Sequence, residues 1–383
     1  MVQTLSNRII IIGGNHLNTL SVIRCLGKCN CKIHVLIHGE QSLNDMSCAN
    51  TRFSYGNTSV VPKSEEDIVQ WLLREQLSEK QILFPCSDFA AYVIDKNAQL
   101  LSKNYYLPGF TDKPMMVCEL MSKWDQKKFA DQIGVSMAKS WLLETQNSNM
   151  DLPSDIVFPC IVKPNKSAFG VKADIEICST KEELQDAFNL LKNNYPQGLL
   201  VQEYIRKTDE YDCMGCILND KKDSVVNIIR KIYDLGGNTV YAQFIDNPLI
   251  SKVNDIVINK LHNMGYRGMF DIEYILSEDR VYLVEINFRH CGVGFGAIKN
   301  KVYAPYLWCL DVCQEIEPKF FKRTVKTGKY LMDETVCFNH RKEFGISLSK
   351  WLLLCIKKCS LAKLDIHDIK GTAFLYKQII HRR

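Results

Sequence analysis

Short apolar runs alternate with amphipathic segments over the first hundred residues. Residues 8–15 read RIIIIGGN, and residues 32–37 (KIHVLI) form a second apolar run after a helix-like segment. Further runs at 59–61 and 81–86 flank an amphipathic stretch at 65–77. Apolar runs that alternate with helical patterns are typical of βαβ units. We therefore expect a Rossmann-like parallel α/β domain over residues 1–110.

The pattern changes twice along the rest of the chain. Residues 111–135 predict one long helix, after which apolar runs and helical segments alternate up to residue 198. From residue 199 to 312 strands dominate in an antiparallel, α+β pattern, and residues 313–383 look helical and basic. The boundaries predict four parts: 1–110, 111–198, 199–312 and 313–383.

Two carboxylates and an amide stand at fixed offsets near the end of the third part. The segments FDIEY (270–274) and VYLVEI (281–286) predict two strands joined by a short turn. Glu285 and Asn287 then share one strand face, and an antiparallel hairpin would bring Glu273 beside Glu285. Carboxylate and amide oxygens of this kind suit Mg²⁺ held against the phosphates of a nucleotide.

Apolar runs earlier in the chain end in further polar residues that are candidates for binding a nucleotide. Lys163 closes the run FPCIVKP, where a buried ammonium needs an anionic neighbour such as phosphate. At the end of the run LLVQEYI, the backbone groups of Glu203, Tyr204 and Ile205 are suited to an adenine edge, and Glu210, seven residues beyond Glu203, is suited to ribose hydroxyls. Taken singly, each of these segments is more often a solvated strand end. Their order along the chain is what favours a nucleotide site.

With these residues in this order, the chain resembles the ATP-grasp superfamily of carboxylate–amine ligases over residues 112–296. The resemblance implies an ATP-grasp fold, α/β and α+β, preceded by a Rossmann-like pre-ATP-grasp domain, with ATP and Mg²⁺ (or Mn²⁺) as cofactors. It assigns the phosphates to Lys123 and Lys163, and the metal to Glu273, Glu285 and Asn287. Carried over residue by residue, it places Glu203, Tyr204 and Ile205 at the adenine, Glu210 at the ribose, Arg289 near the reacting carboxylate, and Arg230 and Lys231 as phosphate-side or substrate-side cations.

The chain departs from the family pattern at three places. The phosphate flap, KSAFGVKAD at 166–174, contains a single glycine, Gly170, with Ser167 as its possible hydroxyl ligand. NFRHCG replaces the commoner N-P-R around Arg289 and so removes a rigid proline. Ser122 stands where an aspartate commonly precedes the first lysine.

The activity that the resemblance implies is activation of a substrate carboxylate as an acyl phosphate, followed by attack of an amine and release of ADP and phosphate. A non-catalytic ATP-binding protein and a biotin-carboxylase-like enzyme remain alternatives. The expected partners are small-molecule carboxylate and amine substrates, with a homodimer possible. Candidate lining residues at predicted strand ends are Asn15, His16, Ser87 and Asp88, although helix caps and turns also explain them.

Composition narrows the function class and the compartment. The net charge of +5 is too small and too evenly spread to indicate nucleic acid, and the apolar runs are too short to cross a membrane. The sixteen cysteines are irregularly spaced behind an N-terminus without a signal-type core, so we expect reduced thiols in a cytoplasmic protein. Gly13 and Gly14 do not complete a dinucleotide-binding fingerprint.

Overall fold

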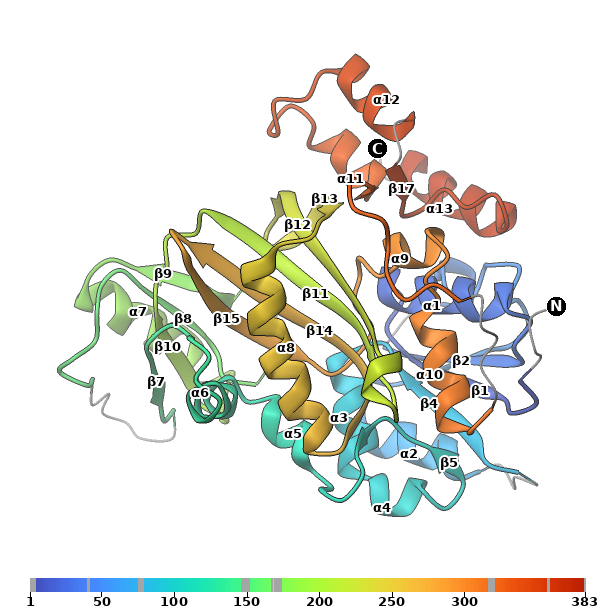
Figure 1. Ribbon diagram of the computed structural model, residues 1–383, viewed down its shortest axis with the longest axis horizontal. Coiled ribbons are helices and arrows are strands. Elements are labelled where there is room, and N and C mark those ends of the chain that lie inside the picture. Colours follow the sequence, from blue (N-terminus) through green and yellow to red (C-terminus); the bar gives the residue numbers. More distant parts are fainter. Residues whose placement is uncertain are drawn as a thin grey trace.

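The computed structural model describes residues 5–39, 42–74, 79–145, 152–166, 168, 174–315, 321–356 and 359–381. Three sheets organise these residues (Figure 1): one parallel sheet of five strands, one antiparallel sheet of four, and one of eight. The mixed α/β architecture agrees with the expected fold class. The four predicted domain boundaries stay predictions.

The first sheet has the strand order β3-β2-β1-β4-β5, and all of its pairs are parallel. Strand β1 is buried along its whole length, as expected for a strand with both faces covered. The Rossmann-like arrangement predicted from the βαβ pattern is confirmed. The strands are β1 Ile9–Gly13, β2 Ile33–His38, β3 Thr58–Val61, β4 Gln81–Pro85 and β5 Tyr105–Tyr106; the helices are α1 Leu17–Lys28, α2 Glu65–Leu73, α3 Asp88–Lys96 and α4 Ala98–Leu101, with a 3₁₀ turn at Leu43–Asp45.

The single long helix predicted over 111–135 is wrong, because two helices occupy this stretch: α5 Met116–Leu120 and α6 Lys123–Gln132. The break lies at Ser122, whose hydroxyl accepts a hydrogen bond from the Asp125 amide and so caps α6. The Lys123 amide donates to the Asn165 carbonyl instead of continuing the preceding turn. The break therefore sets Lys123 at the start of a helix, beside the end of β8.

The second sheet is antiparallel, in the order β7-β10-β8-β9. Helix α7 packs on one face through Leu184, Phe188 and Leu191. Lys163 and Gln202 lie on the other face, and their side chains are hydrogen-bonded to each other. The elements are β7 Ser140–Leu143, β8 Cys160–Pro164, β9 Glu176–Cys178, α7 Lys181–Leu191 and β10 Leu199–Glu203.

The third sheet runs β15-β14-β11-β12-β13-β16-β17, and β6 pairs with the start of β14. Helix α8 covers one face, while α9 and α10 lie between the sheet and α1 (Figure 1). The opposite face near β14 and β15 carries the polar residues considered below. The elements are β6 Gly109–Phe110, β11 Asp209–Ile217, a 3₁₀ turn at Lys221–Asp223, β12 Val225–Leu235, β13 Asn238–Phe244, α8 Pro248–Asn263, β14 Tyr266–Ser277, β15 Arg280–Asn287, α9 Phe295–Lys299 and α10 Ala304–Val312.

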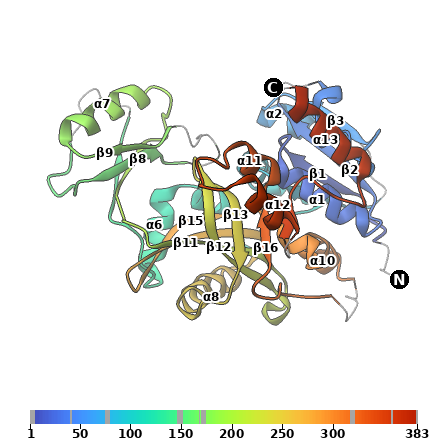
Figure 2. The same cartoon turned by 90° about the horizontal axis from the view of Figure 1, so that it is seen from above.

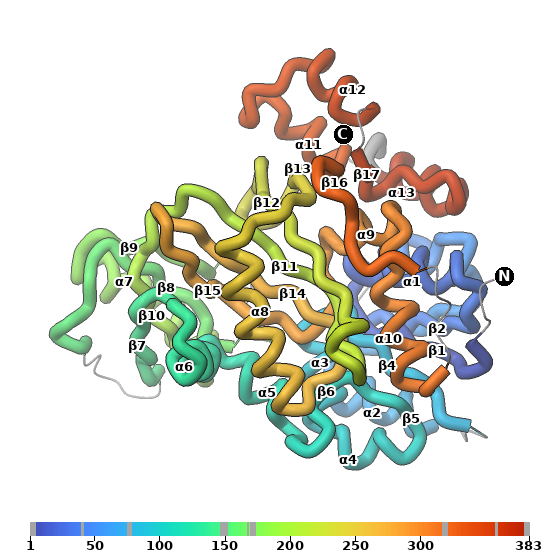
Figure 3. Tube along the Cα trace, viewed as in Figure 1, coloured from blue at the N-terminus to red at the C-terminus, as the bar shows by residue number. Residues whose placement is uncertain are grey.

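The sequence pattern predicts a helical C-terminal part, but the structure also has strands there. Two short strands, β16 Tyr330–Met332 and β17 Cys359–Leu361, extend the third sheet from the edge of β13. Helices α11 Glu334–Asn339, α12 Leu348–Ile356 and α13 Ile369–His381 complete it. Seen from above, these elements lie nearest the viewer, next to α1 (Figure 2), and the chain trace shows α12 as the outermost of them (Figure 3).

All sixteen cysteines are thiols and most of them are buried, as expected. Burial raises the pKa of several, Cys48 and Cys31 among them, to about 12. Within the described residues, no helix is both long and apolar enough to cross a membrane.

Candidate active site

The predicted carboxylate pair forms as expected across the β14–β15 hairpin. Glu273 lies directly opposite Glu285, and Asp271 lies opposite Asn287. Both glutamate side chains are mostly buried, with about a fifth of their surface exposed. A β-bulge follows Glu273 in the ladder. Because side chains alternate along a strand, the four residues share one face of the sheet, opposite α8.

Lys123 reaches this face from the first turn of α6. Its ammonium donates a hydrogen bond of 2.7 Å to Glu285 Oε1. Burial alone would raise the pKa of Glu285, but Lys123, then Lys163 and Arg289, outweigh it and lower that pKa to about 2. Glu285 is therefore an anion at any physiological pH, although it is largely buried.

Lys163 approaches the same carboxylates from β8 of the second sheet. It is 6% exposed, and its ammonium donates to Gln202 Oε1 at 2.9 Å. Burial and the neighbouring Lys123 lower the pKa of Lys163 to about 8, while Glu285 and Glu273 counteract part of this shift. Two ammonium groups from one side of the site thus face the carboxylates of the other.

Lys231 belongs to the carboxylate face, whereas Arg230 does not. The Lys231 ammonium lies 2.5 Å from Glu210, 3.1 Å from Asp212 and 3.4 Å from Glu273. Burial opposes its charge, but these carboxylates raise its pKa well above the ordinary value. Arg230 pairs in register with Tyr211, which faces α8, so its side chain lies on the other side of the sheet. There it is 41% exposed and lies 3.7 Å from Asp209, so the structure does not bring Arg230 into the expected cluster.

Arg289 joins the N-terminal domain to this face. Its guanidinium lies 3.2 Å from Asp88, the first residue of α3, and 3.0 Å from Asp271 on β14. Burial opposes the charge of Arg289, yet Asp88 and Asp271 together raise its pKa. Asp88 was one of four candidate lining residues, and it is the one that contacts a predicted site residue through its charge.

The other three candidates hold local structure. Asn15 Oδ1 accepts hydrogen bonds from the Ser47 hydroxyl and the Cys48 amide. Ser87 caps α3 and contacts His38. His16 lies at the start of α1, where burial, then Arg289 and His38, lower its pKa to about 4. His16 is therefore a neutral ring close to Arg289.

Asp212 and Asp271 are members of the cluster that sequence reasoning missed. Both are buried, and burial raises the pKa of each carboxyl. A signal existed for Asp271, since it stands two residues before Glu273 in FDIEY and so shares its strand face. Asp212 had the same kind of signal, since it stands two residues after Glu210 on one strand, but its contact with Lys231 depends on the pairing of β11 with β12.

The predicted adenine hinge follows directly from β10. The amides of Glu203 and Tyr204 donate to the Lys139 and Pro159 carbonyls, whereas the Ile205 amide bonds to no residue in the part of the chain that the structure describes. Glu203 also borders a cavity of about 530 Å³ that Lys139 and Tyr282 help to line. The hinge therefore has open space beside it. Glu210, expected at the ribose, pairs with Lys207 and Lys231. Ser167 and Gly170 of the expected flap lie outside the described residues.

The donor set fits a hard divalent cation completed by other oxygen ligands. Among the described residues, no three His, Cys, Asp or Glu side chains are arranged as a metal site by themselves. Glu273, Glu285 and Asn287 supply two carboxylates and one amide at neighbouring ladder positions, and Mg²⁺ commonly takes its remaining ligands from phosphate and water. Burial is the main cause of the raised pKa of Asp212 and Asp271, and the neighbouring Glu273 adds to it, so a cation bound at this face would favour their ionised forms.

Comparisons with known proteins agree with this geometry. Residues 128–302 match the model of the ATP-grasp domain. D-alanine–D-alanine ligase of Campylobacter jejuni is 26% identical over 174 residues, which cover 42% of this chain and 48% of that enzyme. Formate-dependent phosphoribosylglycinamide formyltransferase of Wolinella succinogenes is 24% identical over 183 residues, or 46% of each chain. The chain thus matches about half the length of these curated relatives.

Solved structures show the same fold over most of the chain. N5-carboxyaminoimidazole synthetase of Staphylococcus aureus, in complex with ADP, superposes with a TM-score of 0.67 at 14% identity. The superposition covers 90% of this chain and 87% of the synthetase chain. L-amino acid ligase of Bacillus licheniformis gives a TM-score of 0.61 at 14% identity and covers 85% and 78%.

Proposed function

We propose that this protein, whose residues 128–302 match the model of the ATP-grasp domain, is an ATP-dependent ligase that joins a substrate carboxylate to an amine. The observation that carries the proposal is the facing arrangement of charges. Lys123 and Lys163 come from one side of the site, and Glu273, Glu285 and Asn287 come from the other. An ATP triphosphate placed between them would meet ammonium groups on one side and cation ligands on the other.

The lysines bind and neutralise phosphate oxygens. Lys163 is buried beside another cation, which is unfavourable without an anion, so a triphosphate would relieve the repulsion between Lys163 and Lys123. Lys123 would exchange part of its bond with Glu285 for a phosphate oxygen. Phosphoryl transfer needs mainly such positioning and charge stabilisation.

Glu273, Glu285 and Asn287 would hold Mg²⁺ or Mn²⁺, which when bound would draw negative charge from the phosphate oxygens. Glu285 is ionised through Lys123, so it is ready to act as a ligand without losing a proton. Lys231 keeps Glu210, Asp212 and Glu273 in place by pairing with all three.

The nucleoside end would lie at the hinge that follows β10. The Ile205 amide is available to an adenine ring nitrogen, while the Glu203 and Tyr204 amides are committed to backbone carbonyls. The Tyr204 carbonyl would accept from the exocyclic amine of the base. Glu210 would accept from ribose hydroxyls beside its bond to Lys231.

The acid substrate would lie at Arg289, whose planar guanidinium suits a planar carboxylate. A carboxylate oxygen attacks the γ-phosphorus, the bond to the β-phosphate oxygen breaks, and ADP leaves. The amine nitrogen then attacks the acyl carbon of the acyl phosphate and loses a proton, and inorganic phosphate leaves with the electron pair of the broken C–O bond. Asp88 and Asp271 hold Arg289 in place during both steps.

The test is release of ADP and phosphate with Mg²⁺ and ATP across a panel of amino acids and hydroxy acids, each with and without an added amine, with mass spectrometry of the product. Turnover that requires both substrates and yields an amide is expected. Release that depends on bicarbonate alone would favour carboxylase chemistry. ATP binding without release across the panel would favour a non-catalytic nucleotide-binding protein.

A further inference from the structure

Helix α12 exposes a face made of large apolar side chains. Leu348, Leu352, Leu353 and Ile356 are 52%, 49%, 59% and 82% exposed. Their spacing of four, five and eight residues places them on one side of the helix. The other side packs in the body, because Trp351 stacks edge-on against Phe338 and its indole donates to the Glu334 carbonyl. The helix therefore has two apolar sides, of which only one is covered.

The C-terminal segment that contains α12 is strongly basic in sequence. Residues 321–383 contain 14 of the 48 lysines and arginines but only five of the 43 aspartates and glutamates. The remaining chain is consequently net acidic. Lys350 on α12 and Lys342, eight residues before it, are exposed, as is Lys370 at the start of α13.

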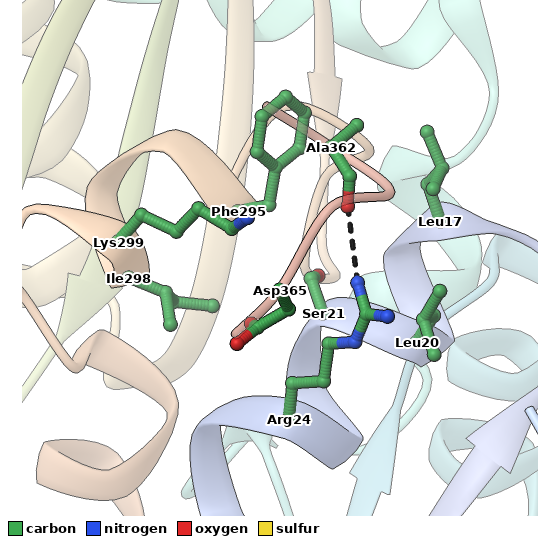
Figure 4. Close-up of a pocket in the computed structure, with 9 residues that line it drawn as sticks. All are labelled: Leu17, Leu20, Ser21, Arg24, Phe295, Ile298, Lys299, Ala362 and Asp365. Carbon is green, nitrogen blue, oxygen red and sulfur yellow. Dashed lines mark hydrogen bonds between the residues drawn. The ribbon is translucent and has the colours of Figure 1, made fainter. Parts of the chain in front are cut away.

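The acidic residues after α12 do not offset this charge at the surface, because both are buried. Asp368 pairs with Arg24 at 2.9 Å and Asp365 with Lys28 at 2.7 Å, and the two aspartates are almost completely enclosed. Figure 4 shows Arg24 and Asp365 of this junction, with the hydrogen bond that Arg24 donates to the Ala362 carbonyl. The junction fixes the C-terminal part to α1, and it leaves the surface of residues 348–383 positive.

We propose that the exposed face of α12 docks on the surface of an anionic lipid bilayer. Apolar side chains on one side of a helix, flanked by lysines, suit the boundary between headgroups and acyl chains. Charge complementarity favours this occupant over a second copy of the same surface, since two basic surfaces repel each other. The position of α12 as an outermost element leaves it accessible to a flat surface (Figures 1 and 3). The inference stands apart from the proposed ligase activity.

The test is sedimentation of the full-length protein with vesicles of phosphatidylcholine alone or mixed with equal parts of phosphatidylglycerol, at low and high salt. The wild-type protein is expected to bind the anionic vesicles, and to bind them less at high salt. The double substitution Leu352→Glu/Leu353→Glu should lower binding by about tenfold or more, and Lys350→Glu should lower it by about fivefold. The single substitutions Leu190→Glu and Lys181→Glu on α7, which place the same kinds of change on another exposed helix, serve as controls and should leave binding unchanged.

Three results would overturn the proposal: no sedimentation of the wild-type protein with anionic vesicles, equal binding to neutral vesicles, or equal losses in the α7 controls. Light scattering tests whether a second copy of the protein occupies the face instead. If the α12 double variant converts a dimer to a monomer without changing vesicle binding, the face belongs to a second copy. Thermal unfolding of each variant detects loss of folding. Sedimentation of the wild-type protein with anionic vesicles tests the proposal even if a variant fails to fold.

Discussion

Arg230 and Lys231 are adjacent in sequence, yet their side chains lie on opposite faces of the third sheet. Lys231 contacts Glu210, Asp212 and Glu273, whereas Arg230 is 3.7 Å from Asp209 and partly exposed. Both had been expected to act as cations in the site. Side chains alternate along β12, so the two neighbours point to opposite faces, and the pairing with β11 puts Lys231 on the face of Glu210 and Asp212.

This separation predicts unequal effects of the same substitution. Lys231→Met should lower ATP-dependent ADP release by about 100-fold, since it removes a buried charge that holds three carboxylates. Arg230→Met, the matched control, should stay within about twofold of the wild type. Equal losses in the two variants, at equal thermal stability, would contradict the assignment of the two faces.

Removal of the carboxylate shared by Lys123 and the expected cation should abolish most turnover. Glu285→Gln is nearly isosteric, and we expect a loss of about 100-fold or more in ADP release. Asp279→Asn in the exposed turn of the same hairpin is the control. Isothermal titration with Mg²⁺ and ATP should show weaker binding in Glu285→Gln only, and unchanged turnover there would remove Glu285 from the site.

The depressed pKa of Lys163 predicts how nucleotide affinity depends on pH. Burial and Lys123 lower that pKa to about 8, so the ammonium that meets phosphate is lost as the pH rises through about 8. The dissociation constant of ATP should then rise by up to about tenfold per pH unit. Lys163→Arg, whose charge persists, should flatten this dependence, and a profile identical to the wild type would argue against Lys163 as a phosphate ligand.

The same pKa has a consequence for stability with the opposite sign. Between about 8 and 10.5 the unfolded chain keeps the Lys163 proton while the folded chain has released it. The free energy of unfolding therefore gains a contribution that increases with pH across this window. Denaturant titrations of the wild type and Lys163→Met should diverge there, and parallel curves would contradict the shift.

Asp88 should act through Arg289. Asp88→Asn leaves the guanidinium held by Asp271 alone, so we expect the KM of the acid substrate to rise by about tenfold with a smaller change in ATP affinity. Arg289→Lys should raise that KM further, because a lysine cannot bridge two carboxylates and a substrate in one plane. A change confined to ATP affinity would place Asp88 outside the substrate side.

The C-terminal junction should contribute strongly to stability. Asp368 is fully buried and accepts hydrogen bonds from Arg24 and from the Arg52 and Gly371 amides. Asp368→Ala leaves Arg24 buried without its partner, which costs about 3–5 kcal/mol of unfolding free energy. The exposed pair of Lys96 and Glu65 is the control, and Glu65→Ala should cost about 1 kcal/mol or less. Similar costs at the two sites would show that the junction is not a buried ion pair in solution.

Local patterns were sufficient for much of this protein. The alternation of strands and helices over residues 1–110 and the hairpin that pairs Glu273 with Glu285 both follow from residues close in sequence. Period-2 alternation also placed Glu285 and Asn287 on one face. In each case the relevant contact is set by a turn or a single strand.

Tertiary structure decided the features that depend on distant partners. The split between α5 and α6 needs the Asn165 carbonyl, and the bridge from Arg289 to Asp88 needs the first and third sheets to meet. Alternation along β12 separates Arg230 from Lys231, but only the pairing of β12 with β11 decided which of the two meets the carboxylates. The open side of α12 depends on the packing of Trp351. A sequence pattern reports which side of an element is apolar or charged, but only the packing of non-local elements determines what that side meets.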